Sequence, residues 1–182
     1  LIPEASAGSI LTVARWLHVI AILSFLAYVP GSKHRHFLLA GPIIYFRSLK
    51  PKGYLPEPHE HIQKAETDLP LDLSWKDQLD VLSCTECGRC QAVCPAASSG
   101  APLSPKLVIT TLRDQLQDGG PLRFEMGLSQ EALWSCTSCR ACMEECPLHI
   151  EHVPKIVDLR RMLVEEAEVE PGLQNAFTQL QK

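Results

Sequence analysis

One long apolar run near the start of the chain is the strongest feature of its hydrophobic pattern. Residues 9–29 read SILTVARWLHVIAILSFLAYV, and only Arg15 and His18 among them can carry a charge. At 1.5 Å per residue a helix over this run is about 31 Å long, enough to cross the hydrocarbon core of a bilayer. Arg15 lies near the start of the run, where a long side chain can reach the headgroups. The pattern predicts a transmembrane helix; the alternative is a buried helix of a soluble protein.

A second, shorter apolar stretch follows the first. Pro30 and Gly31 predict the end of the long helix. The stretch FLLAGPIIYF at 37–46 is too short to span a bilayer and is interrupted by Gly41 and Pro42, so it predicts an interfacial segment. Residues 31–53 contain no acidic residue but several basic ones, namely Lys33, Arg35, Arg47, Lys50 and Lys52. By the positive-inside rule this end of the helix faces the cytoplasm. We therefore expect a protein of the inner (cytoplasmic) membrane whose following part lies on the cytoplasmic side.

Helical spacing returns in the C-terminal part of the chain. Ser104 and Pro105 predict a helix start, and Gly119 predicts its end. Ser129 predicts the start of another helix, and residues 153–167 carry a third apolar face. We find no segment of strand length with alternating polar and apolar residues. The fold class predicted is all-α, with one transmembrane helix and an interfacial segment before a helical soluble part.

The pattern divides the chain into three parts. Residues 1–53 form the predicted membrane segment. Residues 54–73 are rich in proline and acidic residues and predict a linker. Residues 74–182 form the predicted soluble domain.

All eight cysteines lie in this soluble domain, in two copies of the spacing C-x2-C-x2-C-x3-C-P. Three thiolates at intervals of three residues can bind three corners of a [4Fe–4S] cubane, and in two-cluster ferredoxins of this spacing the fourth cysteine binds the other cluster. We therefore predict two clusters with crossed ligand sets. The first set is Cys84, Cys87, Cys90 and Cys146; the second set is Cys136, Cys139, Cys142 and Cys94.

Two other uses of the cysteines are less compatible with this spacing. A disulfide framework rarely repeats such a motif, and the chain lacks a secretory context. A zinc site usually pairs two C-x2-C knuckles and leaves no use for the third cysteine and the proline of each copy. Arg89 and Arg140 either place positive charge beside the clusters or are solvated surface residues. Because neither motif offers a nucleophile, a general base or an open metal position, we predict electron transfer and no catalytic residue.

The charge and the first residue set further bounds. The formal net charge is −4 and the basic residues are concentrated in one place, so we expect no nucleic-acid partner. The chain begins at Leu1 rather than at a methionine, and no small-residue cleavage site follows the apolar run. We therefore expect a partial or processed chain.

The interval between the two motifs resembles that of a known type of domain. The 41 residues between Cys94 and Cys136 leave room for a helix and a loop. This layout resembles the alpha-helical ferredoxin domain, which also occurs in the iron–sulfur subunits of succinate dehydrogenases and in the small subunit of heterodisulfide reductases. The resemblance implies an alpha-helical ferredoxin-like dicluster domain over residues 74–182.

The histidines near the membrane carry a second resemblance. His18 and the stretch YVPGSKHRHFLLAGPIIYF at 28–46 resemble the last helix of the cytochrome b subunit of membrane-bound nitrate reductases. That resemblance implies that His18 and His36 are axial ligands of one or two b-type haems. Each haem then needs a second histidine from outside this chain, unless no haem binds here. For His36 the alternative is membership of the interfacial basic cluster.

As a whole the chain resembles membrane-anchored, heterodisulfide reductase-related iron–sulfur proteins, on the motifs SCTECGRC, PLSPK and SCTSCRAC. The resemblance implies a quinone oxidoreductase of the electron-transfer flavoprotein:quinone type. In it, two [4Fe–4S] clusters carry electrons between a soluble donor, such as electron-transfer flavoprotein, and haem b and quinone in the membrane. The haem b helices and cysteine-rich CCG domains of that family then lie outside this chain. The alternatives are part of a heterodisulfide reductase-type enzyme whose catalytic CCG domains lie elsewhere, and a structural anchor.

Overall fold

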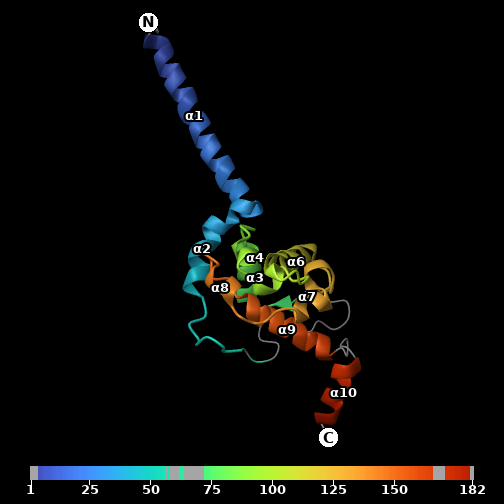
Figure 1. Ribbon diagram of the computed structural model, residues 1–182. Coiled ribbons are helices and arrows are strands. Elements are labelled where there is room, and N and C mark those ends of the chain that lie inside the picture. Colours follow the sequence, from blue (N-terminus) through green and yellow to red (C-terminus); the bar gives the residue numbers. More distant parts are fainter. Residues whose placement is uncertain (1–3, 56, 58–61, 64–71, 166–170, 181–182) are drawn as a thin grey trace.

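The computed structural model describes residues 4–55, 57, 62–63, 72–165 and 171–180. Helix α1 (Glu4–Tyr28) projects away from the rest of the molecule (Figure 1). Residues 8–31 are long and apolar enough to cross a membrane, and within them only Val29, at the end of the span, is buried. The helix ends at Pro30 and Gly31 as the sequence predicted, in the short turns η1 (Val29–Gly31) and η2 (Lys33–Arg35). Helix α2 (His36–Tyr45) then covers most of the expected interfacial segment.

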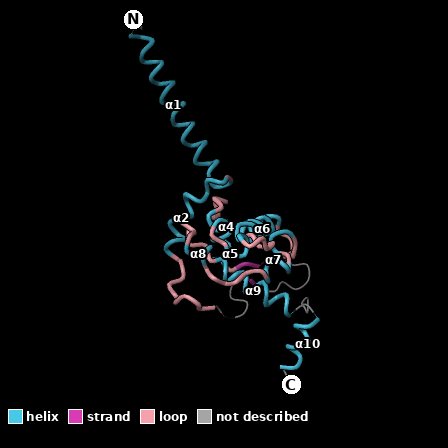
Figure 2. The backbone as a smooth tube through the Cα atoms, viewed as in Figure 1, coloured by secondary structure: helices cyan, strands magenta, loops and turns pink. Residues whose placement is uncertain are grey.

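The part of the chain after α2 is a group of helices, and the described residues contain one pair of two-residue strands (Figure 2). The pair is antiparallel, with Ile62 opposite Leu73. The predicted linker lies mostly outside the described residues. The remaining elements in chain order are β1 (Ile62–Gln63), β2 (Asp72–Leu73), α3 (Trp75–Ser83), α4 (Arg89–Ala92), α5 (Pro95–Ser98), α6 (Pro105–Asp118), η3 (Met126–Leu128), α7 (Gln130–Trp134), α8 (Ala141–Glu144), α9 (His152–Glu165) and α10 (Pro171–Leu180).

The helix boundaries follow the capping signals of the sequence. The hydroxyl of Ser104 accepts a hydrogen bond from the Leu107 amide at 3.2 Å, and Pro105 occupies the first turn of α6. Gly119 ends α6 with a φ of 67°, which glycine adopts without strain. The hydroxyl of Ser129 accepts from the Ala132 amide at 3.3 Å at the start of α7. The all-α prediction is confirmed, with a helical domain behind one long apolar helix.

The core lies where helices α3, α6, α7 and α9 meet. Val81 comes from α3, Ile109 and Leu112 from α6, and Leu133 and Leu159 from α7 and α9, and all five are fully buried. Apolar faces of four helices thereby cover one another, which removes their surface from water. Since the two motifs are joined to these helices, the core fixes the separation of the motifs.

Helix α2 belongs to this core on one of its faces. Ile43 is fully buried in the same cluster as Val81, and α2 packs against α3. The Arg35 guanidinium donates from Nε to the carbonyl of Leu82 at 3.0 Å, and the rings of Phe46 and Trp75 meet edge to face at 5.1 Å. The opposite face stays exposed and apolar, with Phe37, Leu38, Ile44 and Tyr45.

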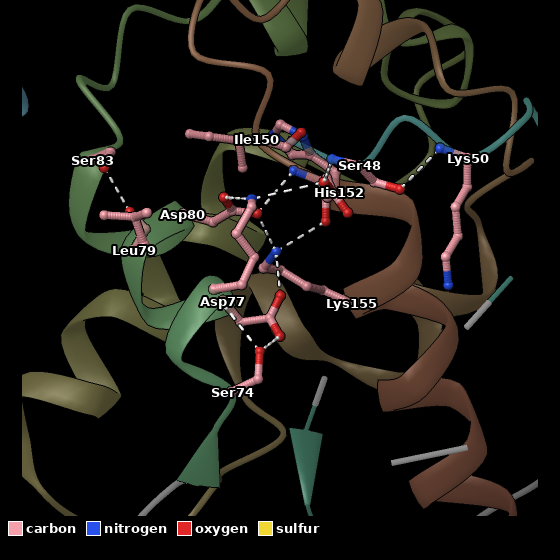
Figure 3. Close-up of polar contacts among 12 residues, drawn as sticks. Ser48, Lys50, Ser74, Asp77, Leu79, Asp80, Ser83, Ile150, His152 and Lys155 are labelled. Carbon is pink, nitrogen blue, oxygen red and sulfur yellow. Dashed lines mark hydrogen bonds and ion pairs between the residues drawn. The ribbon is translucent and has the colours of Figure 1, made fainter. Parts of the chain in front are cut away.

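A buried ionic cluster joins α3 to α9 (Figure 3). The Lys155 ammonium is fully buried, 2.6 Å from a carboxylate oxygen of Asp77 and 2.6 Å from one of Asp80. It also donates to the Glu151 carbonyl at 3.1 Å, and Asp80 accepts from the Glu151 amide at 3.1 Å. Burial by itself lowers the pKa of Lys155, but the charges of Asp80 and Asp77 outweigh it and raise the pKa. The ammonium therefore stays charged and links the two helices.

Candidate iron–sulfur centres

The eight cysteines are free thiols that gather, four and four, at two pockets. The first pocket is lined by three cysteines of the first motif and one of the second, together with Pro147 and His152; the cysteines are Cys84, Cys87, Cys90 and Cys146. The second pocket is lined by three cysteines of the second motif and one of the first, together with Pro105 and Val153; the cysteines are Cys136, Cys139, Cys142 and Cys94. The structure thus brings together both sets that the sequence grouped.

Contacts between the short helices place the fourth cysteine of each motif in the pocket of the other motif. Helix α4 of the first motif packs against α8 of the second, and α8 packs against α9. Cys94 is the N-cap of α5, just behind α4, so that it reaches the second pocket. Each pocket is therefore built from both halves of the domain.

The two motifs also share an unusual backbone. Glu86 and Ser138, each just before the second cysteine of its motif, have φ values of 58° and 55°. Gly88 and Arg140, each just after it, have φ values of 81° and 66° and are the N-caps of α4 and α8. Residues other than glycine rarely adopt this left-handed backbone conformation. The strain at Glu86, Ser138 and Arg140 indicates that the shape of each loop outweighs the backbone preference of these residues. In both motifs the tight loop directs backbone amides at sulfur: the Ser138 amide donates to the Cys136 Sγ at 3.4 Å.

The environment of the thiols opposes their ionisation while no metal is bound. Burial, followed by the charges of Cys84 and Cys146, raises the pKa of Cys90 to about 11. Burial and the neighbouring charge of Cys136 raise the pKa of Cys142 to about 12. Burial is also the largest cause that raises the pKa of Cys84 and of Cys146. Because metal ligands must be thiolates, cations have to offset this repulsion, and binding must release protons.

Two half-buried arginines contact the cysteine loops from neighbouring helices. Arg113 of α6 forms an ion pair with Glu86 at 2.7 Å and steadies the first loop. Arg160 of α9 donates to the Leu133 carbonyl at 2.9 and 2.6 Å and to the carbonyl of Cys136. It thereby satisfies carbonyl groups at the end of α7. Sequence reasoning missed both arginines, because each is far from its loop along the chain and lies on a helix that reads as amphipathic.

The donor set fits an iron–sulfur cubane. Each pocket offers four sulfurs with backbone amides nearby, which is the type of ligand and of hydrogen bonding that these clusters use. Among the described residues, no three histidine, cysteine, aspartate or glutamate side chains are placed to hold a single metal ion. A cubane has a different requirement, because its four irons occupy separate corners and its thiolates spread around it.

The predicted haem ligands lie on two different helices. His18 is in the exposed part of α1, and His36 is the first residue of α2. The turns at Pro30 and Lys33 interrupt the helix between them, so the two histidines do not share a continuous helix face. The ring of His36 lies 4.4 Å from that of Phe37.

Comparison with known proteins is consistent with this geometry. Residues 76–147 match the family described as "4Fe-4S dicluster domain". The chain is 32% identical to the "Probable iron-sulfur-binding oxidoreductase FadF" of Bacillus subtilis, over 98% of this chain and 32% of the relative. It is 35% identical to the "EtfAB:quinone oxidoreductase" of Syntrophomonas wolfei, over 92% of this chain and 28% of the relative.

The name of a third relative combines a membrane anchor with a ferredoxin. The chain is 39% identical to the "Probable membrane-anchored ferredoxin" of Chromohalobacter salexigens, over 57% of this chain and 19% of the relative. The chain thus spans about a third or less of the length of these relatives. No solved structure matches it. The residues that match the 4Fe-4S dicluster domain, 76–147, hold all eight cysteines of the two four-thiol pockets.

Proposed function

We propose that this chain is the electron-transfer segment of a membrane quinone oxidoreductase. The observation that carries the proposal is the crossed composition of the two pockets, each lined by three cysteines of one motif and one of the other. The likeness to an EtfAB:quinone oxidoreductase over nearly all of this chain supports the quinone-linked class.

In this proposal the first cluster is held by Cys84, Cys87, Cys90 and Cys146, and the second by Cys136, Cys139, Cys142 and Cys94. A bound [4Fe–4S] cluster accepts and donates one electron at a time. The residues of the chain hold the thiolates, aim amide groups at sulfur and exclude water from the buried cysteines Cys94 and Cys142. Cys87 and Cys139 are exposed, one in each pocket, so each site has a side open to a redox partner.

The proposal extends to the membrane side. Residues 1–53 form the membrane segment, 54–73 the linker and 74–182 the cluster domain, which lies on the cytoplasmic side of the inner membrane. His18 and His36 each bind a b-type haem together with histidines from outside this chain. Electrons then pass between a soluble donor, such as electron-transfer flavoprotein, and haem and quinone in the bilayer.

The ligand sets are tested by Cys94→Ala and Cys146→Ala in the full chain, purified without oxygen. Iron analysis of the parent should give about eight irons per chain, four for each cubane. Cys94→Ala should weaken the EPR signal of the cluster of the second motif, and Cys146→Ala that of the first. Loss of the signal only from the motif that carries the substitution contradicts the crossing, and zinc in place of iron contradicts the proposal as a whole.

The haem assignment needs a separate measurement in the intact complex. His18→Ala should remove the absorption of one b-type haem while the iron of the cluster domain stays bound. Unchanged haem absorption would take His18 out of the ligand set.

A further inference from the structure

The fourth cysteine of the second motif begins a short loop whose amide groups turn back towards its sulfur. Cys146 lines the first pocket, and the loop after it runs to Glu151, just before α9. Burial raises the pKa of the Cys146 thiol, and hydrogen bonds from the Ile150 and Leu148 amides oppose this effect, because an amide donor stabilises a thiolate. Hydrogen bonds to sulfur also stabilise the more negative, reduced form of a bound cluster, so these amides raise its reduction potential.

The backbone of this loop is tightly turned and strained. His149 has a φ of 54°, which residues other than glycine rarely adopt. The His149 amide donates to the Cys146 carbonyl at 3.0 Å, and the His152 amide donates to the Ile150 carbonyl at 3.2 Å. A strained backbone persists only where surrounding contacts hold it, so the loop needs contacts from other elements.

Asp80 of α3 and Lys155 of α9 supply such contacts, and both point towards the loop (Figure 3). The Asp80 Oδ2 accepts a hydrogen bond from the buried Glu151 amide at 3.1 Å. The Lys155 ammonium donates to the Glu151 carbonyl at 3.1 Å and lies 2.6 Å from the same Oδ2. Glu151 is thereby held at both its amide and its carbonyl, directly after the residue whose amide donates to the sulfur of the loop.

Helix α3 also carries another ligand of the first pocket. Asp80 lies in the last turn of α3, which ends at Ser83, and Cys84 follows at once. Two of the four cysteines of the first pocket, one from each motif, are therefore joined to the same helix turn. The fourth cysteine of the first motif has a different setting, because Cys94 is the N-cap of α5 and a helix follows it directly.

We propose that Asp80 is a positioning residue for the first cluster. By holding Glu151 it keeps the amides of the loop on the sulfur of Cys146, and this raises the reduction potential of that cluster. The charge of Asp80 acts in the opposite direction, since negative charge beside a cluster favours its oxidised form. This role rests on the proposed function, because it needs the first cluster.

The variants Asp80→Asn and Asp80→Ala separate the hydrogen bond from the charge. Both remove the charge, but only asparagine keeps an oxygen that can accept from the Glu151 amide. An EPR-monitored redox titration of the full chain, purified in detergent without oxygen, measures both clusters. The first cluster should be about tenfold harder to reduce in Asp80→Ala than in Asp80→Asn, which is a potential lower by about 59 mV. The second cluster should have the same potential in both variants.

The matched control is the pair Asp77→Asn and Asp77→Ala. Asp77 lies 2.6 Å from the same Lys155 ammonium, one turn earlier on α3, whereas the single N–H of Glu151 is donated to Asp80. The two Asp77 variants should therefore share one potential for the first cluster. Equal potentials in the two Asp80 variants, or an equally large difference within the Asp77 pair, overturn the proposal. Loss of the first cluster from Asp80→Ala but not from Asp77→Ala supports it, and loss from both overturns it.

Hydrogen exchange followed by mass spectrometry tests the loop without measuring a potential. Residues 148–151 should exchange at least tenfold faster in Asp80→Ala than in Asp80→Asn, whereas α6 should exchange equally in the two. Equal exchange of the loop overturns the hold of Asp80 on it. Absence of the first cluster from the parent overturns the proposed function, and the exchange of the loop then still decides whether Asp80 holds it.

Discussion

Replacing Lys155 by methionine should destabilise the cluster domain more than any other single charge removal in it. Methionine keeps much of the length of the side chain but removes the ammonium that lies 2.6 Å from both Asp77 and Asp80. Both carboxylates are fully buried, so neither can turn to water. Breaking a buried ion pair by removing one partner costs about 3–5 kcal/mol. Domains are stable by only about 5–15 kcal/mol, so a large part of the total is at risk.

Urea unfolding of the full chain, followed by far-UV circular dichroism in detergent without oxygen, measures this loss. Since urea lowers stability by about 1–3 kcal/mol per molar, the midpoint should fall by at least about 1 M. The difference should be constant between neutral pH and pH 9. The raised pKa of Lys155 means that its contribution is complete below the ordinary lysine value and declines only above it.

A triple variant separates unpaired charge from lost packing. Lys155→Met combined with Asp77→Asn and Asp80→Asn also removes the two negative charges that the Lys155 ammonium balances, so it should recover most of the lost midpoint. A single variant whose midpoint stays within a few tenths of a molar of the parent would refute the reasoning. Equal midpoints for the single and triple variants would instead assign the loss to packing.

Three further changes test other parts of the domain. Burial lowers the pKa of His152 to about 4. The fold therefore keeps its full stability above the ordinary histidine pKa of about 6.5, and about 3 kcal/mol of unfolding free energy should be lost as the pH falls from 6.5 to 4. His152→Gln should flatten this part of the plot of urea midpoint against pH, and an unchanged plot would contradict the prediction. Gly127→Ala should cost about 1–3 kcal/mol in urea unfolding, because the new Cβ would lie 2.7 Å from the Leu107 carbonyl carbon, whereas Gly172→Ala meets nothing within 4 Å and should not lower stability. Arg160→Gln should weaken the EPR signal of the second cluster, since it loses bonds to the Leu133 and Cys136 carbonyls, whereas Arg113→Gln should weaken that of the first, and the opposite pattern would refute both roles.

The local signals of the sequence predicted the helices that begin with a cap and end with glycine. Helix α6 begins after Ser104, whose hydroxyl caps the first turn, and ends at Gly119, which adopts the left-handed conformation. The spacing of the cysteines also grouped them as the pockets do, because the motif encodes a tight loop around a point. That these sets bind two clusters stays a prediction.

Long-range packing explains what the pattern could not indicate. Helix α3 was not predicted, because its buried face carries Asp77 and Asp80 beside Val81 and does not read as apolar. Lys155 occupies a buried position on α9 that a hydrophobic pattern assigns to solvent. The burial of α3 and of Lys155 is explained only when the two helices are considered together, because the two carboxylates and the ammonium neutralise one another.

The burial of Ile43 in the core has a consequence for how fast electrons can travel. Because Ile43, Arg35 and Phe46 hold α2 against α3, the cluster domain is fixed to α2 and is not joined to it by a loose tether. In the proposed electron path, every copy then presents the same tunnelling distance to an acceptor bound beside α2. Reduction followed after a laser flash should accordingly decay with one rate constant rather than a spread of them.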